Sequence, residues 1–153
     1  MERKGKRMNW KQEAVEKLRR YDAMQRATEN IPLEISRLKA ESEAMGCGLS
    51  MAPSGGKNVH RKEDVWMNNL MTRQQLQWSL DQAKSWTGPV SRALSALEPE
   101  ERLILQQMYI VPQRGALERL SSSFGVEKSS IYRRRDKALR KFTLSLYGAE
   151  ESN

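Results

Sequence analysis

Residues 117–133 read LERLSSSFGVEKSSIYR, and this stretch decides the fold. Two helix-forming runs flank Gly125, which supplies the positive φ that a tight turn between helices requires. The pattern therefore predicts a helix-turn-helix over 116–142. The apolar residues expected to pack beneath its turn are Leu120, Phe124, Val126 and Ile131.

The second helix of this predicted unit divides into two faces when its residues are projected at about 100° each. An apolar face that must pack inward holds Ile131, Ala138 and Phe142, flanked by Leu139 and Leu146. A polar face that must point outward holds Ser129, Arg133, Asp136, Lys137 and Arg140. Seven of the nine basic residues after position 113 lie between Lys128 and Lys141, where Asp136 is the only acid. A solvated basic helix is the alternative interpretation, but the concentration of charge favours a helix that binds duplex DNA.

The two ends of this helix predict different contacts with DNA. The N-terminal part of a recognition helix enters the major groove, where side chains reach base edges. We expect base contacts from Lys128, Ser129, Tyr132 and Arg133. Phosphate contacts, which hold register without reading sequence, are expected from Ser130, Lys137, Arg140 and Lys141.

Composition supports a polyanionic partner. The chain has 153 residues, 27 Lys and Arg against 19 Asp and Glu, a net charge of +8 and a pI near 9.8. An excess of this size favours nucleic acid or an acidic membrane surface, although many basic soluble proteins share it. No apolar run approaches the roughly 18 residues of a membrane span, so we expect a cytoplasmic protein with no membrane partner.

Catalysis and metal binding find no support in the sequence. Cys47 is the only cysteine and His60 the only histidine, which excludes an intramolecular disulfide and the usual multi-cysteine or His-pair metal sites. No nucleophile–base pair or carboxylate pair stands out. We therefore expect no catalytic residues, no metal and no cofactor, and a protein that is not an enzyme.

Long amphipathic helices precede the predicted helix-turn-helix. The first, over 1–45, begins near Asn9 as N-cap and carries a near-heptad apolar stripe that Pro32 should kink or break. A glycine-rich linker is expected over 46–61, and a second long helix and connector over 62–93, with an interruption at Thr87-Gly88-Pro89 and a short helix over 90–97. Three tryptophans of the second helix, Trp66, Trp78 and Trp86, do not share one face.

These segments predict an all-α fold. Long N-terminal helices, forming a hairpin or a coiled coil, are followed by a tri-helical helix-turn-helix domain over 94–148 and a tail over 149–153. Within that domain, Pro99 should begin a helix that runs to Tyr109. Because a single hairpin cannot cover every tryptophan, a homodimer through the N-terminal helices is the expected assembly. Folding of the two helices on each other within one chain is the alternative.

A resemblance to a known family adds to this interpretation. Residues 97–105, LEPEERLIL, resemble the first helix of region 4 of the sigma-70 family of bacterial transcription initiation factors, and 131–142 is similar to its recognition helix. Residues 132–139, YRRRDKAL, followed by LYG at 146–148, look more like small phage and prophage late-gene regulators of the ArpU and RinA type.

The resemblance implies a phage-type transcription regulator that binds double-stranded DNA and contacts RNA polymerase. A phage DNA-packaging component such as a small terminase subunit is the alternative, because it also joins a DNA-binding helical module to a coiled coil. Two features depart from the family. Arg134 stands where sigma factors place an apolar residue, so its stem must snorkel or the packing must differ. The loop over 110–115 carries Pro112 and Gly115 where the family continues directly into the next helix.

Overall fold

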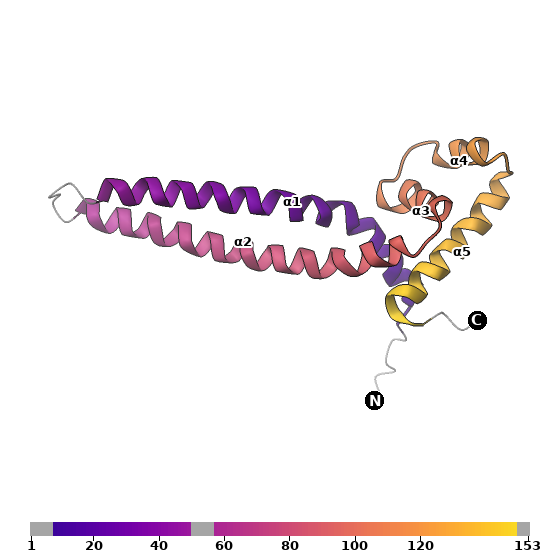
Figure 1. Cartoon of the computed structure of the whole chain (residues 1–153), viewed down its shortest axis with the longest axis horizontal. Coiled ribbons are helices and arrows are strands. Elements are labelled where there is room, and N and C mark those ends of the chain that lie inside the picture. The colour runs from indigo at the N-terminus through magenta and orange to yellow at the C-terminus, as the bar shows by residue number, and fades with distance from the viewer. Residues whose placement is uncertain (1–7, 50–56, 150–153) are drawn as a thin grey trace, which may run out of the picture. The chain divides into compact units, whose positions relative to one another are not determined.

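The structure is a computed structural model that describes residues 8–49 and 57–149; for 47–49 and 57–60 it describes the backbone alone. Every regular element in the described residues is helical, which confirms the expected all-α class. The elements in chain order are α1 (Trp10–Leu49), α2 (Lys57–Ser95), α3 (Pro99–Leu105), the π-helix η1 (Gln106–Ile110), α4 (Ala116–Phe124) and α5 (Lys128–Tyr147) (Figure 1).

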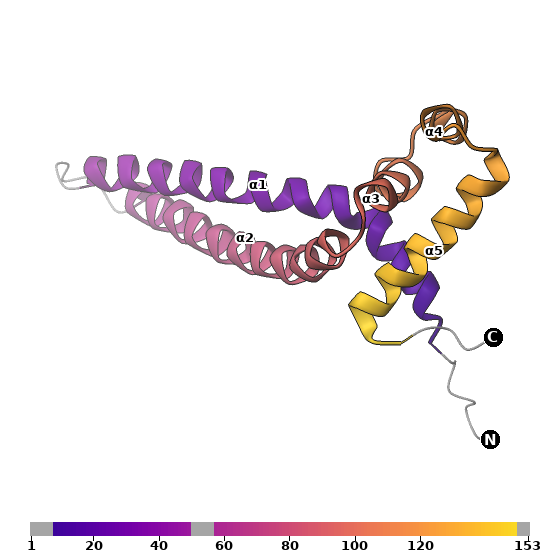
Figure 2. The same ribbon diagram turned by 45° about the vertical axis from the view of Figure 1, so that its right-hand side comes forward.

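The chain forms two compact units. One, here called the hairpin unit, is Met24–Ser85, and the other, here called the C-terminal unit, combines Trp86–Asn153 with the N-terminal residues up to Ala23. In the hairpin unit α1 and α2 lie side by side in both ribbon views (Figures 1 and 2). A buried amide joins them, because Asn69 Nδ2 donates to the carbonyl of Leu38 at 2.8 Å. Arg73 Nε in turn donates to Asn69 Oδ1 at 2.9 Å, which completes the bonding of that amide.

Two prolines lie inside the long helices, and neither ends its helix. The predicted break at Pro32 and the predicted interruption at Thr87-Gly88-Pro89 are therefore wrong, whereas the alternative of a kink at Pro32 stays a prediction. α1 runs without a break through Pro32, and α2 runs through Pro89 to Ser95, so the separate helix over 90–97 does not form. A proline inside a helix costs about 3 kcal/mol. Packing on the same helix offsets this cost: Thr87 and Val90 are both buried beside Pro89.

The helix ends also differ from expectation in places. The linker predicted over 46–61 is helical at 46–49 and at 57–61, and its centre lies outside the described residues. The helix predicted to end at Tyr109 is an α-helix only to Leu105, after which the chain adopts π geometry. Two predicted starts are confirmed. Asn9 Oδ1 accepts from the backbone N–H of Gln12 at 2.8 Å, and Pro99 lies in the first turn of α3.

The main core of the C-terminal unit draws on both ends of the chain. Its buried residues are Ala14 and Leu18 of α1, Val90 and Ala93 of α2, Leu97 and Leu105 around α3, and Ala138, Leu139 and Phe142 of α5. The compact unit around the predicted helix-turn-helix therefore includes residues before position 94, and its core is incomplete without the start of α1. A second cluster, under the turn, consists of Ile104, Leu120 and Ile131.

An aromatic cluster links the start of α1 to the end of α5. The Trp10 and Tyr147 ring centroids are 4.8 Å apart. Lys17, which interrupts the apolar stripe of α1, places its ammonium 5.0 Å from the Tyr147 centroid and 5.5 Å from the Trp86 centroid. This charged residue therefore contributes to packing through its contact with ring faces, an attraction that grows as the pair is desolvated.

None of the helices in the described residues combines the length and the apolar content needed to cross a membrane.

Candidate nucleic-acid interface

The turn between α4 and α5 is built around a left-handed glycine. Gly125 ends α4 with φ 62°, as the sequence predicted. The backbone N–H of Val126 donates to the carbonyl of Ser121 at 3.1 Å, and the Ser121 hydroxyl donates to the carbonyl of Val126 at 2.5 Å. These reciprocal bonds fix the point at which α5 leaves the turn.

Apolar packing beneath the turn sets the orientation of α5. Leu120 and Ile131 are buried together with Ile104 of α3, and Phe124 and Val126 pack against them. Along α5 the buried side chains also include Ala138, Leu139 and Phe142. The predicted inward face is therefore confirmed.

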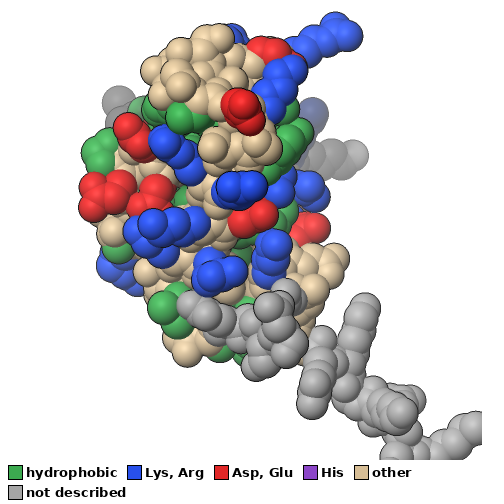
Figure 3. All heavy atoms as spheres, turned by 90° about the vertical axis from the view of Figure 1, so that its right-hand side faces the viewer, with side chains coloured by type: hydrophobic (Ala, Val, Ile, Leu, Met, Phe, Trp, Pro, Cys, Tyr) green, Lys and Arg blue, Asp and Glu red, His purple; other side chains and the backbone are tan. Residues whose placement is uncertain are grey.

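The opposite face of α5 is exposed. Exposed residues here include Lys128, Ser129, Tyr132, Arg133, Asp136, Lys137, Arg140 and Lys141, whereas Ser130 is half-buried. All the residues expected to contact base edges are therefore accessible, and among the expected phosphate contacts only Ser130 is partly covered. Figure 3 shows one face of the molecule on which Lys and Arg side chains are spread with Asp and Glu among them.

Acidic residues of the C-terminal unit form ion pairs with some of these cations. Lys128 Nζ lies 3.3 Å from Glu118 Oε1, and Lys141 Nζ lies 2.8 Å from Glu101 Oε1. The pKa of Glu118 is lowered, first by a hydrogen bond from its own backbone and then by Lys128. Two of the eight residues predicted to bind DNA, Lys128 and Lys141, thus form ion pairs within the chain.

Three cations of α5 have no ion pair within the described part of the chain: Arg133, Lys137 and Arg140. They are separated by four and three positions, a spacing that places them on one stripe of a helix. Arg133 lies in the first two turns of α5, and the other two lie further along it. The outward surface of α5 therefore carries three cations without an ion pair in the described part of the chain, and Asp136, which pairs with Arg135, lies among them.

Two further arginines of α5 are held against aromatic rings. The Arg134 guanidinium lies 5.6 Å from the Phe124 centroid and bonds Glu100 Oε2 at 3.3 Å. This arrangement keeps the charged group of Arg134 at the surface while the residue covers the core. The Arg135 guanidinium lies 4.9 Å from the Tyr132 centroid and also bonds Asp136 Oδ1 at 2.9 Å.

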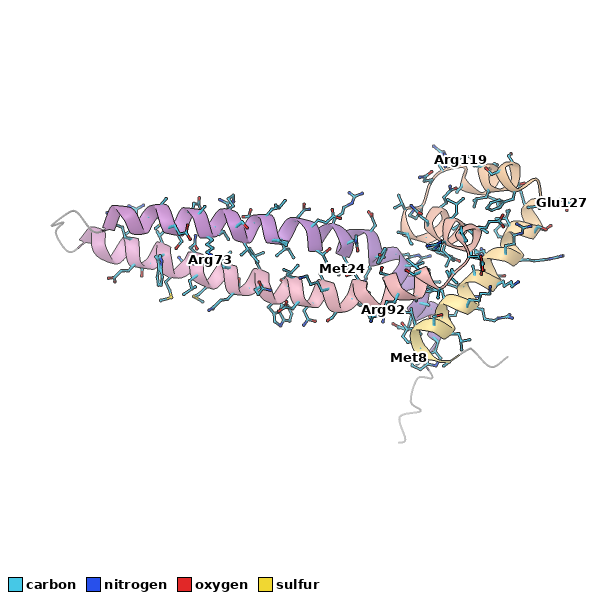
Figure 4. The ribbon with its side chains drawn as sticks, in the orientation of Figure 1. Met8, Met24, Arg73, Arg92, Arg119 and Glu127 are labelled. Carbon is cyan, nitrogen blue, oxygen red and sulfur yellow. The ribbon has the colours of Figure 1, made fainter. Side chains whose placement is uncertain are left out.

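The loop before α4 is fixed by another arginine. Arg119 Nη2 donates to Gln113 Oε1 at 2.9 Å and to the carbonyl of Arg114 at 3.1 Å. Arg119 on α4, and Glu127 immediately before α5, are labelled in Figure 4. Gly115 ends this loop with φ 75°. The segment 110–115 therefore forms an ordered turn.

Sequence reasoning missed the acidic side of this surface. Glu100 and Glu101 were interpreted as residues of a helix N-terminus, and their contacts with Arg134 and Lys141 join positions 34 and 40 residues apart. No local spacing rule reveals pairs of that separation.

Comparisons of the chain with protein-family models, with curated proteins and with solved structures find no match. Among the described residues, no group of three His, Cys, Asp or Glu side chains is placed to hold a metal ion.

Proposed function

We propose that this protein is a sequence-specific double-stranded DNA-binding transcription regulator that inserts α5 into the major groove. The observation that carries the proposal is the line of unpaired cations, Arg133, Lys137 and Arg140, on a helix that follows a glycine turn. The face of α5 opposite these cations is buried against the rest of the C-terminal unit, so the charged face is the one available to a partner.

The same observation favours nucleic acid over an acidic membrane surface. A helix that lies on a membrane inserts an exposed apolar face between the lipids while basic residues contact the head groups. The apolar side chains of α5 that would serve this purpose, such as Ile131 and Phe142, are fully buried. Apart from Tyr132 and Leu144, the exposed side chains of α5 are polar or charged and mostly cationic, which suits the phosphates of a duplex.

Different parts of α5 would contribute affinity and specificity. Arg133 can form two hydrogen bonds with a guanine edge, and Ser129 and Tyr132 lie close to it in the first turns. Lys137 and Arg140 would neutralise phosphates further along the helix. Ser130 and the paired residues Lys128 and Lys141 would contribute once they are exposed or released on DNA.

One part of the proposal comes from the resemblance of 97–105 and 131–142 to sigma-70 region 4. This part is that the protein controls phage or prophage transcription in the cytoplasm and contacts RNA polymerase. The DNA-packaging alternative makes a different prediction, since packaging subunits assemble as large rings. A particle mass that corresponds to a large ring of copies would favour that alternative.

The test starts with the full chain and a pool of random duplexes. Repeated selection and sequencing should yield an enriched site, on which Arg133→Ala should bind about 5- to 150-fold more weakly, corresponding to roughly 1–3 kcal/mol. Lys39→Ala, which removes an exposed cation from the hairpin unit, is the matched control and should bind as the wild type does. Failure to enrich any sequence, with equal binding by both variants, would refute the proposal.

A further inference from the structure

An unpartnered stripe runs along α2 in the hairpin unit. Met67, Met71 and Trp78 are exposed by 48%, 52% and 66%. Each lies two positions from a buried residue, Asn69 or Leu80, and therefore about 200° away around the helix. The stripe thus faces away from α1, and nothing within the described residues of the hairpin unit covers it.

The spacing of the stripe is that of a helix-packing seam. With Gln74 included, its members are separated by four, three and four positions, the interval at which coiled-coil core residues recur. A flat or extended partner would not require this repeat. The shape of the surface therefore fits a helix laid along α2.

The absence of charge along the stripe indicates which kind of partner helix would bind there. Between positions 65 and 80 the only charged residue is Arg73, whose guanidinium bonds Asn69 within the hairpin (Figure 4 labels Arg73 on α2). A surface without charge has no attraction for nucleic acid and no complementarity to an acidic or basic protein. It is, however, well suited to an identical copy, because a two-fold axis would otherwise bring like charges together.

We infer that this face of α2, here called the α2 seam, is where a second copy of the chain docks in antiparallel orientation. In antiparallel packing, alternate seam positions face each other. Trp78 then meets Met67 of the second copy, and Met71 meets Gln74 of the second copy, each contact occurring twice. Sulfur–aromatic contacts of this kind are favourable. Shifting the helices by one heptad would instead place Met71 against the carboxylate of Asp81, which apolar packing disfavours.

The area available makes this a dimer of modest affinity. A tryptophan buries about 150–250 Å² when fully covered, so Trp78 alone offers roughly 100–160 Å² from its exposed two-thirds. With two half-exposed methionines beside it, the seam falls below the roughly 1,200 Å² of total area at which stable interfaces begin. Association is therefore expected in the micromolar range.

Sedimentation equilibrium of the full chain without DNA tests the inference independently of the proposed function. The wild type should show a concentration-dependent monomer–dimer equilibrium across the micromolar range. Met71→Glu with Trp78→Glu should weaken it at least tenfold, because two carboxylates per copy would enter the seam. Leu33→Glu is the control: Leu33 is 70% exposed and lies on α1 outside the seam, and the substitution adds one carboxylate per copy, so dimerisation should be retained. Circular dichroism establishes that each variant keeps its helical content.

Cysteine cross-linking tests the orientation and remains informative if the double variant misfolds. In a Cys47→Ser background, Gln74→Cys should form a disulfide-linked dimer with copper-phenanthroline as oxidant, since the two copies of position 74 are about three residues, or 4.5 Å, apart along the axis. Met67→Cys should not, because its copies lie about 11 residues, or 16 Å, apart, beyond the roughly 7 Å that a disulfide spans. Efficient cross-linking at position 67 would show a parallel arrangement and overturn the inference. A monomer at every concentration, or dimerisation unaffected by the seam variants, would do the same.

Discussion

Lys141 Nζ on α5 lies 2.8 Å from Glu101 Oε1 on α3, although the two residues are 40 positions apart in the sequence. The carboxylate is mostly covered, with 14% of its side chain exposed, whereas the lysine side chain is 47% exposed. Glu101 therefore holds in place a cation that stands on the edge of the proposed DNA-binding face, and it competes with phosphate for that cation.

Replacing Glu101 by Gln should release Lys141 to the DNA. We expect tighter binding to every duplex, and a slope of log affinity against log salt that is steeper by about one, as for one additional phosphate contact. Fluorescence anisotropy titrations at several salt concentrations measure both. Glu98→Gln changes the net charge equally without touching Lys141 and serves as control. An identical slope in the two variants would mean that Lys141 does not reach phosphate.

Leu18→Ala should destabilise the C-terminal unit although Leu18 lies on the first helix. Its side chain is fully buried in the same cluster as Phe142, and removing a buried leucine side chain costs about 2–5 kcal/mol. Urea unfolding monitored by circular dichroism gives the change. Leu33→Ala, at a residue that is 70% exposed, should stay within about 0.5 kcal/mol of the wild type. Equal effects of the two substitutions would contradict the assignment of Leu18 to the core.

Gly125→Ala should destabilise by about 1–2 kcal/mol, the cost of a left-handed backbone for an L-residue. The space around it is open, since a Cβ there would meet nothing within 4 Å, so the cost comes from the backbone alone. Gly46→Ala provides a control of opposite sign: it lies in α1 with no positive φ, and alanine there should stabilise by about 0.5–1 kcal/mol. Thermal unfolding of both variants distinguishes the two effects. A Gly125→Ala variant as stable as wild type would show that the turn does not need φ 62°.

Tyr147→Phe should leave the protein at least as stable as the wild type at neutral pH. The Tyr147 hydroxyl is buried without a hydrogen-bond partner among the described residues, so its loss removes an unsatisfied group. Burial, and secondarily Glu13, raise the pKa of this phenol above its ordinary value of 10.0. The folded state then holds the proton more tightly than the unfolded state, so this contribution is complete below pH 10 and is lost as pH rises through the raised pKa.

The alkaline part of this prediction has its own measurement. Melting temperatures taken between neutral pH and pH 11 should fall less steeply for Tyr147→Phe than for wild type. Tyr132→Phe, on the exposed face of α5, leaves Tyr147 in place and should retain the wild-type slope. A steeper fall for Tyr147→Phe would reverse the sign of the effect.

Local pattern was sufficient for the turn at Gly125 and for the buried face of the helix that follows it, but not for their surroundings. The spacing of Leu120, Gly125 and Ile131 predicted both the turn and the buried face, because these features depend on residues close in sequence. The expectation at Pro89 was wrong because the local preference of proline was outweighed by the burial of Thr87 and Val90, which the sequence does not display. The continuation of α1 through the exposed Pro32 has no such explanation in the structure.

The contribution of Leu18 to the same core as Phe142 was not foreseen either. A helical stripe shows which face is buried but not which distant element buries it. The ion pairs of Glu100 and Glu101 were missed for the same reason, since each joins two helices whose spacing in the chain carries no periodic signal.

The joining of Leu18 and Phe142 in one core has a consequence for the order in which the newly made chain folds. On the ribosome, α1 emerges before α5, so its buried residues have no α5 to pack against until that helix has been synthesised. The hairpin unit has no such delay, because both of its helical segments are complete once Ser85 has emerged. We expect a nascent chain stalled after α2 to contain a formed hairpin with Ala14 and Leu18 still accessible to solvent and to chaperones. The proposed DNA-binding surface would be assembled only after α5 has emerged.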